Sequence, residues 1–216
     1  MGITTAVAPE VAAAATSGAA AVVIPKVASV DYVDEICAHL DAAGAPATMS
    51  IWAMIETPTA IFDVRAIAAH PRVSVLVMGT NDLARELRAA LIPGRQPLLS
   101  HLATALAAAR EAGKVILDGV YNDVKDLDGF RTECIQGAQM GFDGKTLIHP
   151  AQVDIANDVW APTPEEVLYA RRVIAAFDEG LAAGRGVVTV DGRMIENLHV
   201  ANAQRTIAVA DAIASL

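Results

Sequence analysis

Short apolar runs alternate with longer amphipathic stretches along most of the chain. The runs are rich in Val, Ile or Leu and lack the alternation of apolar and polar residues that a half-exposed strand shows. This pattern is typical of strands buried on both faces of a parallel sheet. The predicted strands are Ala20–Ile24, Met49–Ile55, Val73–Met78, Val115–Leu117 and a weaker one at Gln139–Phe142.

Helices are predicted between these strands, and the first begins with a proline, which is favoured at the first helical position. An alternation of strands and helices indicates parallel strands joined by right-handed crossovers. The predicted helices are Pro9–Ser17, Val30–Ala43, Thr59–Ala69, Leu98–Ala112 and Asp126–Gln139.

Two α/β architectures suit this order, a doubly wound open sheet and a (β/α)8 TIM-type barrel. Polar residues follow several strands in turn, at Lys26, Glu56, Asp82 and Asp118. A barrel spreads one site over successive strand ends, whereas an open sheet concentrates it at one switch point. The Gly-rich turn of the open-sheet folds is missing after the first strand, where Ser29 begins a helix cap instead. We therefore expect the barrel.

The pattern changes after Pro150. Thr163 to Ala183 predicts one long helix that begins with a cap, a proline and two acids. A short strand and turn at Val187–Gly192 and a helix from Asn197 to Leu216 follow. We expect two parts, a partial barrel with the metal site at residues 1–160 and a helical arm or cap at residues 161–216.

The strand count is short of a closed barrel. Five strands are recognisable where eight are needed, and the first residues, Gly2–Thr5, are loop-like. A barrel that lacks its first three strands exposes two sheet edges and its inner core. We expect such a chain to be poorly soluble, or soluble without enzymatic turnover, until its sheet is completed.

Composition indicates what builds the core and which partners are unsuited to the chain. Apolar residues make up 54% of the chain but aromatic residues only 4%, so Ala, Val, Ile and Leu build the core. A net charge of −9 argues against nucleic acid and anionic lipid as partners. Cys37 and Cys134 are far apart and in no metal-binding spacing, which is typical of reduced thiols. No apolar run reaches membrane-spanning length, and we expect a soluble, cytoplasmic protein.

Glu56 and Asp82 are the candidate metal ligands. Each is a carboxylate directly after a buried strand, in neighbouring βα units, and a buried carboxylate is costly unless a cation or donors meet it. Two hard oxygen donors suit Mg²⁺, with the other positions left to water and substrate. The competing interpretation has Asp82 capping a helix that starts at Leu83 and Glu56 in an ion pair.

Three further residues have similar alternatives. Lys26 is predicted at the same rim, where it binds a phosphate or carboxylate, forms a Schiff base, or pairs with a neighbouring acid. Asp118 has the same ambiguity between a catalytic role and an ion pair. His149 precedes Pro150, a position more often occupied by a hydrogen-bonded loop residue than by a general base.

Taken together, the motifs at the strand ends resemble the citrate lyase beta-subunit-like branch of the HpcH/HpaI aldolase superfamily, which includes malyl-CoA and citramalyl-CoA lyases. The resemblance covers nearly the whole chain. The motifs are Ile24–Val27, Ile55–Pro58, Met78–Leu83, Asp118–Tyr121, Gly141–Gln152 and Asp191–Glu196.

The resemblance implies a (β/α)8 barrel, usually a homotrimer, with Mg²⁺ held by Glu56 and Asp82 and the 2-oxoacid part of the substrate held at that metal. It also implies that a tail carboxylate of a neighbouring subunit acts as acid or base on the acyl-CoA. That residue is Glu196, where the family usually has Asp. We assign Glu196 and Asp118 as catalytic and Glu56 and Lys26 as substrate-binding.

The implied reaction is cleavage of a β-hydroxyacyl-CoA to an acyl-CoA and a 2-oxoacid, with the metal stabilising the developing oxyanion. Two alternatives stay open: a lyase of free 2-oxoacid aldols without CoA, and a non-catalytic or truncated barrel homologue. The family has an upstream arginine that binds the substrate carboxylate, but the first arginine here is Arg65, in a predicted helix. Activity therefore depends on how that carboxylate is held.

Overall fold

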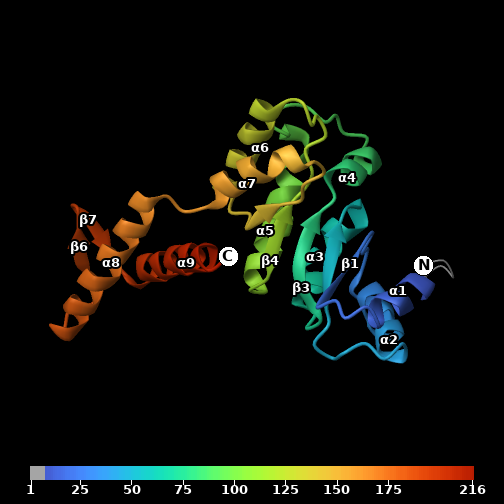
Figure 1. The fold of residues 1–216 in the computed structure, drawn as a ribbon, viewed down its shortest axis with the longest axis horizontal. Helices are drawn as coiled ribbons and strands as arrows, with labels where there is room; N and C mark the ends of the chain where they lie inside the picture. Colours follow the sequence, from blue (N-terminus) through green and yellow to red (C-terminus); the bar gives the residue numbers. More distant parts are fainter. Residues whose placement is uncertain (1–7) are drawn as a thin grey trace. The chain divides into compact units, whose positions relative to one another are not determined.

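The computed structural model describes residues 8–216 and forms two compact units, one ending at Ala156 and the other running from Asn157 to Leu216. The loop predicted at Gly2–Thr5 lies outside the described residues. Figure 1 shows the helices and strands of both units, coloured along the sequence. From residue 8 onward, no helix combines the length and apolar character that a membrane span requires.

The N-terminal unit contains one sheet of five parallel strands in the order β1-β2-β3-β4-β5. Four of the predicted strands are confirmed, whereas the prediction of a strand at Gln139–Phe142 is wrong. Helix α6 runs on to Met140 and ends at Gly141 in a left-handed conformation (φ 105°), and the strand comes later. The strands are β1 (Ala21–Ile24), β2 (Ser50–Ile55), β3 (Val73–Met78), β4 (Val115–Asp118) and β5 (Gly144–Lys145).

Helices connect these strands, and their starts follow from local sequence. Ser29 accepts a hydrogen bond from the Tyr32 N–H at 3.2 Å, and Thr57 does the same for Ala60 at 3.1 Å, so both side chains cap a helix. The short helix α7 was not predicted, and α4 was predicted only in the alternative in which Asp82 caps a helix that starts at Leu83. The helices are α1 (Ala8–Ala15), α2 (Val30–Ala42), α3 (Pro58–Ala69), α4 (Thr80–Leu87), α5 (Leu99–Glu111), α6 (Leu127–Met140) and α7 (Val153–Trp160).

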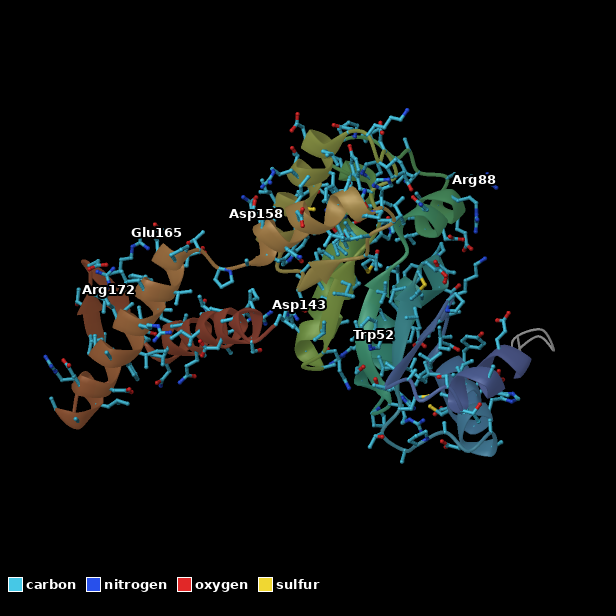
Figure 2. All side chains as sticks on the ribbon, viewed as in Figure 1. Trp52, Arg88, Asp143, Asp158, Glu165 and Arg172 are labelled. Atoms are coloured by element: carbon cyan, nitrogen blue, oxygen red, sulfur yellow. The ribbon has the colours of Figure 1, made fainter. Side chains whose placement is uncertain are left out.

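The two faces of the sheet differ in how they are covered. Ile55 of β2 pairs in register with Met78 of β3, and both are fully buried on the face against which α3 and α5 pack. Trp52, labelled in Figure 2, belongs to the opposite face, because side chains alternate along a strand. Its neighbour in register, Val23 of β1, is 48% exposed. Val115 of β4 is similarly exposed. The face away from the helices is therefore apolar and partly open to solvent.

The C-terminal unit is a pair of helices and a β-hairpin. The long helix predicted from Thr163 is observed as α8 (Pro164–Ala182), and it begins with a capping box between Thr163 and Glu166. The antiparallel strands β6 (Val188–Val190) and β7 (Arg193–Ile195) follow, and α9 (Asn197–Ala214) ends the unit. At its surface, Arg172 of α8, labelled in Figure 2, pairs with Asp191 of the hairpin turn at 2.8 Å.

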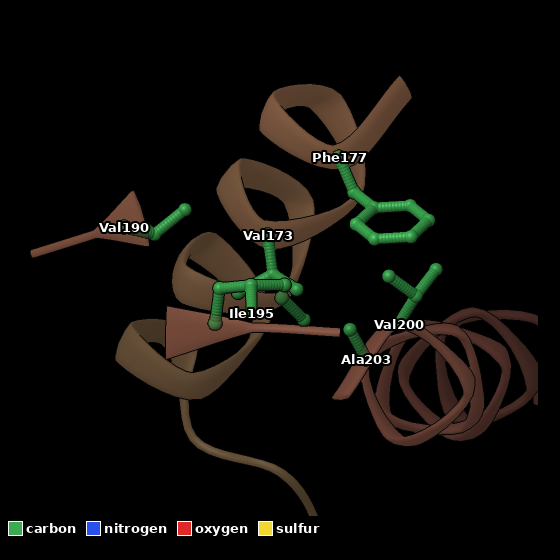
Figure 3. Packing of buried hydrophobic residues seen from close by; sticks show 7 residues of the cluster. Val173, Phe177, Val190, Ile195, Val200 and Ala203 are labelled. Atoms are coloured by element: carbon green, nitrogen blue, oxygen red, sulfur yellow. The ribbon is translucent and has the colours of Figure 1, made fainter. Parts of the chain in front are cut away.

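A separate apolar core stabilises this unit (Figure 3). Phe177 of α8 lies opposite Val200 of α9, and Ile195 of β7 packs beside Val173 (Figure 3). Each of the core residues is no more than 9% exposed, so the unit buries its own hydrophobic cluster. The cluster is Ala170, Val173, Phe177, Val190, Ile195, Val200 and Ala203.

A buried ion network joins the end of β4 to the helix layer. Arg95 Nη1 donates to both carboxylate oxygens of Asp118, at 2.7 and 2.8 Å, and Lys145 Nζ donates to the same carboxylate at 3.1 Å. Lys145 also donates to Glu133 of α6 at 2.7 Å, and Arg95 Nε lies 3.6 Å from that carboxylate. Asp118 and the Lys145 side chain are inaccessible to solvent. Two cations thus neutralise two carboxylates inside the unit.

Removing one partner of this network should be costly. Asp118→Asn leaves Arg95 and Lys145 with a net buried positive charge, which we expect to lower the free energy of unfolding by about 3–5 kcal/mol. Asp128→Asn, at an exposed position in the first turn of α6, is the matched control and should cost no more than about 1 kcal/mol. Urea denaturation measures the free energy of unfolding of both variants. Equal midpoints for the two variants would contradict a stabilising role of the buried ion network.

Candidate functional site

Three of the predicted site residues lie together where β1, β2 and β3 end. Lys26 follows β1 after Pro25, Glu56 directly follows β2, and Asp82 lies in the first turn of α4, after β3. The strands are parallel neighbours, so their carboxyl ends share one edge of the sheet. The structure therefore confirms that these three residues of successive βα units are brought to one place, where Lys26 Nζ lies 3.7 Å from Asp82.

Glu56 is the most constrained of the three. Its side chain is nearly inaccessible, and one carboxylate oxygen accepts a hydrogen bond from the Lys26 backbone N–H at 2.7 Å. A Cβ added to Gly79 would collide with the Glu56 side chain, so only glycine fits at the end of β3. Lys26 has a left-handed backbone (φ 51°), unusual for a residue with a side chain. The carboxylate is thus fixed by backbone on two sides.

The environment of Glu56 disfavours its negative charge. Burial raises the pKa of the Glu56 carboxyl above its ordinary value, the Lys26 N–H opposes this shift, and the nearby charge of Asp82 adds to it. Two carboxylates that interact in this way are stabilised by a cation between them. A cation bound beside Glu56 would favour its charged form, as the Lys26 and Arg85 side chains already do.

Two side-chain cations face Asp82. Arg85, one turn along α4, donates to Asp82 at 2.6 Å, and the more distant Lys26 completes the cluster. The Lys26 side chain is more than half exposed, so it is accessible to a bound molecule. Arg85 was not predicted, although its position three residues after Asp82 on a helix is a recognisable signal for such a pair.

The donor set fits a magnesium ion. Mg²⁺ commonly takes one or two protein carboxylates and fills its other positions with water and substrate oxygens. Glu56 and Asp82 provide two hard oxygen donors of that kind. Within the described part of the chain, no group of three or more His, Cys, Asp or Glu side chains could hold a metal. The pair therefore suits a partly hydrated ion better than a closed protein cage.

Asp118 is not part of this cluster, and Glu196 belongs to the other compact unit. Asp118 continues the row of Ile55 and Met78 on the helix-covered face, where the ion network engages it. Glu196 lies in the C-terminal unit, at the start of α9, where its backbone N–H donates to His199 Nδ1 at 3.0 Å. Its catalytic role, like that of Asp118, stays a prediction.

His149 has a structural contact. It precedes the short 3-10 helix Pro150–Gln152, and its ring Nδ1 accepts a hydrogen bond from the Ala151 N–H at 3.1 Å. This is the hydrogen-bonded loop position that the sequence favoured over a general base.

Comparison with known proteins places this geometry in a family. Residues 3–150 match the family described as HpcH/HpaI aldolase/citrate lyase. A (3S)-malyl-CoA thioesterase of Cereibacter sphaeroides is 48% identical over 206 residues, covering 95% of this chain and 70% of that protein. The citrate lyase subunit beta of Escherichia coli is 38% identical over 152 residues, covering 70% of this chain and 50% of that protein.

Solved structures give the same result. The crystal structure of CitE from Mycobacterium tuberculosis, in complex with magnesium, acetoacetate and coenzyme A, has a TM-score of 0.77 and 26% identity. The match covers 96% of this chain and 74% of that one. A citrate lyase from Burkholderia xenovorans has a TM-score of 0.84 at 20% identity, covering 98% of this chain and 70% of that one, and supports the fold alone. The resemblance read from the strand-end motifs is therefore confirmed: the chain belongs to the HpcH/HpaI aldolase/citrate lyase family, a family of enzymes.

Proposed function

We propose that Glu56 and Asp82 bind Mg²⁺ and that the protein is a carbon–carbon lyase acting on a β-hydroxyacyl-CoA of the malyl-CoA, citramalyl-CoA or citryl thioester type. The observation that carries the proposal is the placement of two carboxylates at adjacent strand ends, Glu56 buried after β2 and Asp82 in the first turn of α4 after β3. The structural relative that was crystallised with magnesium, acetoacetate and coenzyme A supports the same ligands for this chain.

The bound metal would supply positive charge where oxyanion charge develops during cleavage, an effect worth several kcal/mol. The chain's own residues do the rest. The accessible Lys26 ammonium binds a substrate carboxylate or the thioester side of the substrate. Glu56 and Asp82 would hold the ion, and the ion would supply that charge at the 2-oxoacid part of the substrate.

The reaction needs a base and an acid. A base takes the proton of the β-hydroxyl, the carbon–carbon bond breaks, and its electron pair passes to the α-carbon of the acyl-CoA. That carbon then takes a proton, which gives the acyl-CoA and a carbonyl product. We assign this acid or base role to Glu196, a half-buried residue at the start of α9. In this proposal the protein is a homo-oligomer, expected to be a trimer, and a neighbouring copy contributes Glu196 to each site.

Hydrolysis of the thioester is the second candidate. It is favoured by one observation, the 48% identity to a (3S)-malyl-CoA thioesterase over nearly the whole chain. Both candidates share the substrate class and the metal site and differ in the bond that breaks. A lyase of free 2-oxoacid aldols and a non-catalytic homologue are the remaining alternatives.

We further propose that the sheet is part of a closed (β/α)8 barrel. The five strands are parallel and follow one another in chain order, with helices on one face, as in such barrels. The other face exposes apolar side chains, including Val23 and Val115, and further strands would cover them. A crystal structure of the native protein that shows an open five-stranded sheet would contradict this.

The metal assignment is tested by calorimetric titration of the 216-residue chain with Mg²⁺. Glu56→Gln and Asp82→Asn should each weaken binding by more than about 100-fold, because changes to outer-sphere partners alone already cost about 10–100-fold. Glu86→Gln, an acid on the same helix as Asp82, is the control and should leave the affinity within about twofold. If both Glu56→Gln and Asp82→Asn bind Mg²⁺ with unchanged affinity, the proposed metal site is wrong.

The broken bond is identified from the products of malyl-CoA, measured with the native protein purified from its host. Carbon–carbon cleavage gives acetyl-CoA and glyoxylate, whereas hydrolysis gives malate and free CoA. We expect glyoxylate, trapped as its hydrazone, in amounts equal to the substrate consumed and only with Mg²⁺ present. Free thiol without glyoxylate selects the thioesterase, and tight Mg²⁺ binding with neither product selects the non-catalytic homologue.

The role of Glu196 is tested by mixing inactive variants made in the native host. Glu56→Ala and Glu196→Ala should regenerate activity in mixed oligomers, because some sites then combine an intact metal pair with an intact tail. Glu56→Ala mixed with Asp82→Ala is the matched control and should stay inactive, since every metal site lacks a ligand. Lack of recovery in the first mixture, with subunit exchange shown by native mass spectrometry, counts against the shared site.

A further inference from the structure

The first turn of α4 carries Asp82 but has no side-chain cap of its own. Gly79 occupies the cap position and offers no side chain to the free backbone N–H groups of the turn. The direction of the Asp82 carboxylate depends on this turn, because the residue lies at its third position. Another contact must therefore fix the start of the helix.

That contact is a pair of asparagines. Asn81, directly before Asp82, donates from its side-chain amide to Asn122 Oδ1 at 2.9 Å, and Asn122 donates back to Asn81 Oδ1 at 2.7 Å. The two hydrogen bonds close a ring between α4 and the loop after β4. Both amides use one donor and one acceptor, so neither can be replaced by a hydrocarbon without losing both bonds.

The loop that bears Asn122 is itself anchored. The Tyr121 hydroxyl donates to Asp126, the cap of α6, at 2.6 Å, and the Tyr121 ring packs on Phe130. Gln152, which is fully buried, donates to the Tyr121 carbonyl at 3.1 Å and accepts from the Ile148 N–H at 3.1 Å. The asparagine pair thus joins α4 to a loop held from two sides.

Close packing joins the same two segments at their base. A Cβ added to Gly119 would collide with the Thr80 side chain, so the first residue of α4 lies directly against the backbone at the end of β4. Thr80 and Asn81 together fix the start of α4 against this loop, one by packing and the other by hydrogen bonds.

We propose that Asn81 and Asn122 are positioning residues for the divalent-cation site, which hold the first turn of α4 so that the Asp82 carboxylate meets the ion together with Glu56. The proposal rests on the metal site proposed above. Neither asparagine contacts the ion. They act through Asp82, which their hydrogen bonds orient before the ion arrives.

The exposure of both asparagines separates this role from a role in folding. Hydrogen bonds between exposed side chains contribute little to global stability, because water replaces a lost partner. The orientation of a ligand is more sensitive, since loss of a supporting contact lets the carboxylate move while the fold stays intact. Metal affinity should therefore change where the unfolding temperature does not.

The test is calorimetric titration of the 216-residue chain with Mg²⁺. Asn81→Ala and Asn122→Ala should each weaken Mg²⁺ binding by about tenfold, the low end of the effect of an outer-sphere contact, because the Asp82 carboxylate must then be ordered as the ion binds. The double variant should be no weaker than the weaker single variant, because both substitutions remove the same contact. Asn202→Ala, at an exposed position of α9, is the control and should match the parent chain.

The outcomes distinguish this inference from the site on which it depends. If the parent chain binds Mg²⁺ and the asparagine variants bind it equally well, the positioning role is wrong and the metal site stands. Additive losses in the double variant also overturn it, because independent effects do not pass through one contact. If the parent chain does not bind Mg²⁺ at all, the proposed function and this inference fall together. Asn122→Ser, a smaller polar change, repeats the test should Asn122→Ala lower the unfolding temperature.

Discussion

Burial of the Glu56 carboxylate at the end of β2 is the constraint around which the site is built. A carboxylate so little accessible to water is costly unless donors or cations meet it. The Lys26 backbone N–H donates a hydrogen bond to this carboxylate, and Lys26 has a left-handed conformation there. On the other side, Gly79 has no Cβ, which leaves room for the Glu56 side chain. Asp82 and its cations then assemble around a carboxylate whose place is already fixed.

Register explains why two acids that look alike in the sequence have different surroundings. Glu56 is one residue beyond Ile55, whereas Asp118 is the residue that continues the row of Ile55 and Met78 across the sheet. A difference of one residue along a strand turns a side chain to the other face. Asp118 therefore pairs with Arg95 and Lys145 in the helix layer. In the sequence, Glu56 and Asp118 both follow an apolar run, so the sequence alone does not reveal that they face opposite sides of the sheet.

Most of the fold could be predicted because buried parallel strands leave a strong signal. The first four strands, the helix caps at Ser29 and Thr163 and the long helix α8 all appear in the expected places. The fifth strand could not be predicted, since Gly144–Lys145 is too short to form an apolar run and Gln139–Phe142 mimicked one at the end of a helix. The short helix α4 has Gly79 at its cap position, so the alternative in which Asp82 caps a helix from Leu83 placed the start three residues late.

Two positively charged side chains, Lys26 and Arg85, lie beside the Asp82 carboxylate. Lys26 and Arg85 both face Asp82, so they partly compensate the charge that a metal would otherwise neutralise. A divalent cation held by Asp82 would weaken the attraction between Lys26 and that carboxylate, and would leave the exposed Lys26 ammonium available to an anion. Arg85 is held three residues away on the same helix and keeps its place. If the site binds a divalent ion as proposed, metal and substrate binding would be coupled through Lys26, because the ion would free the ammonium for an anion of the substrate.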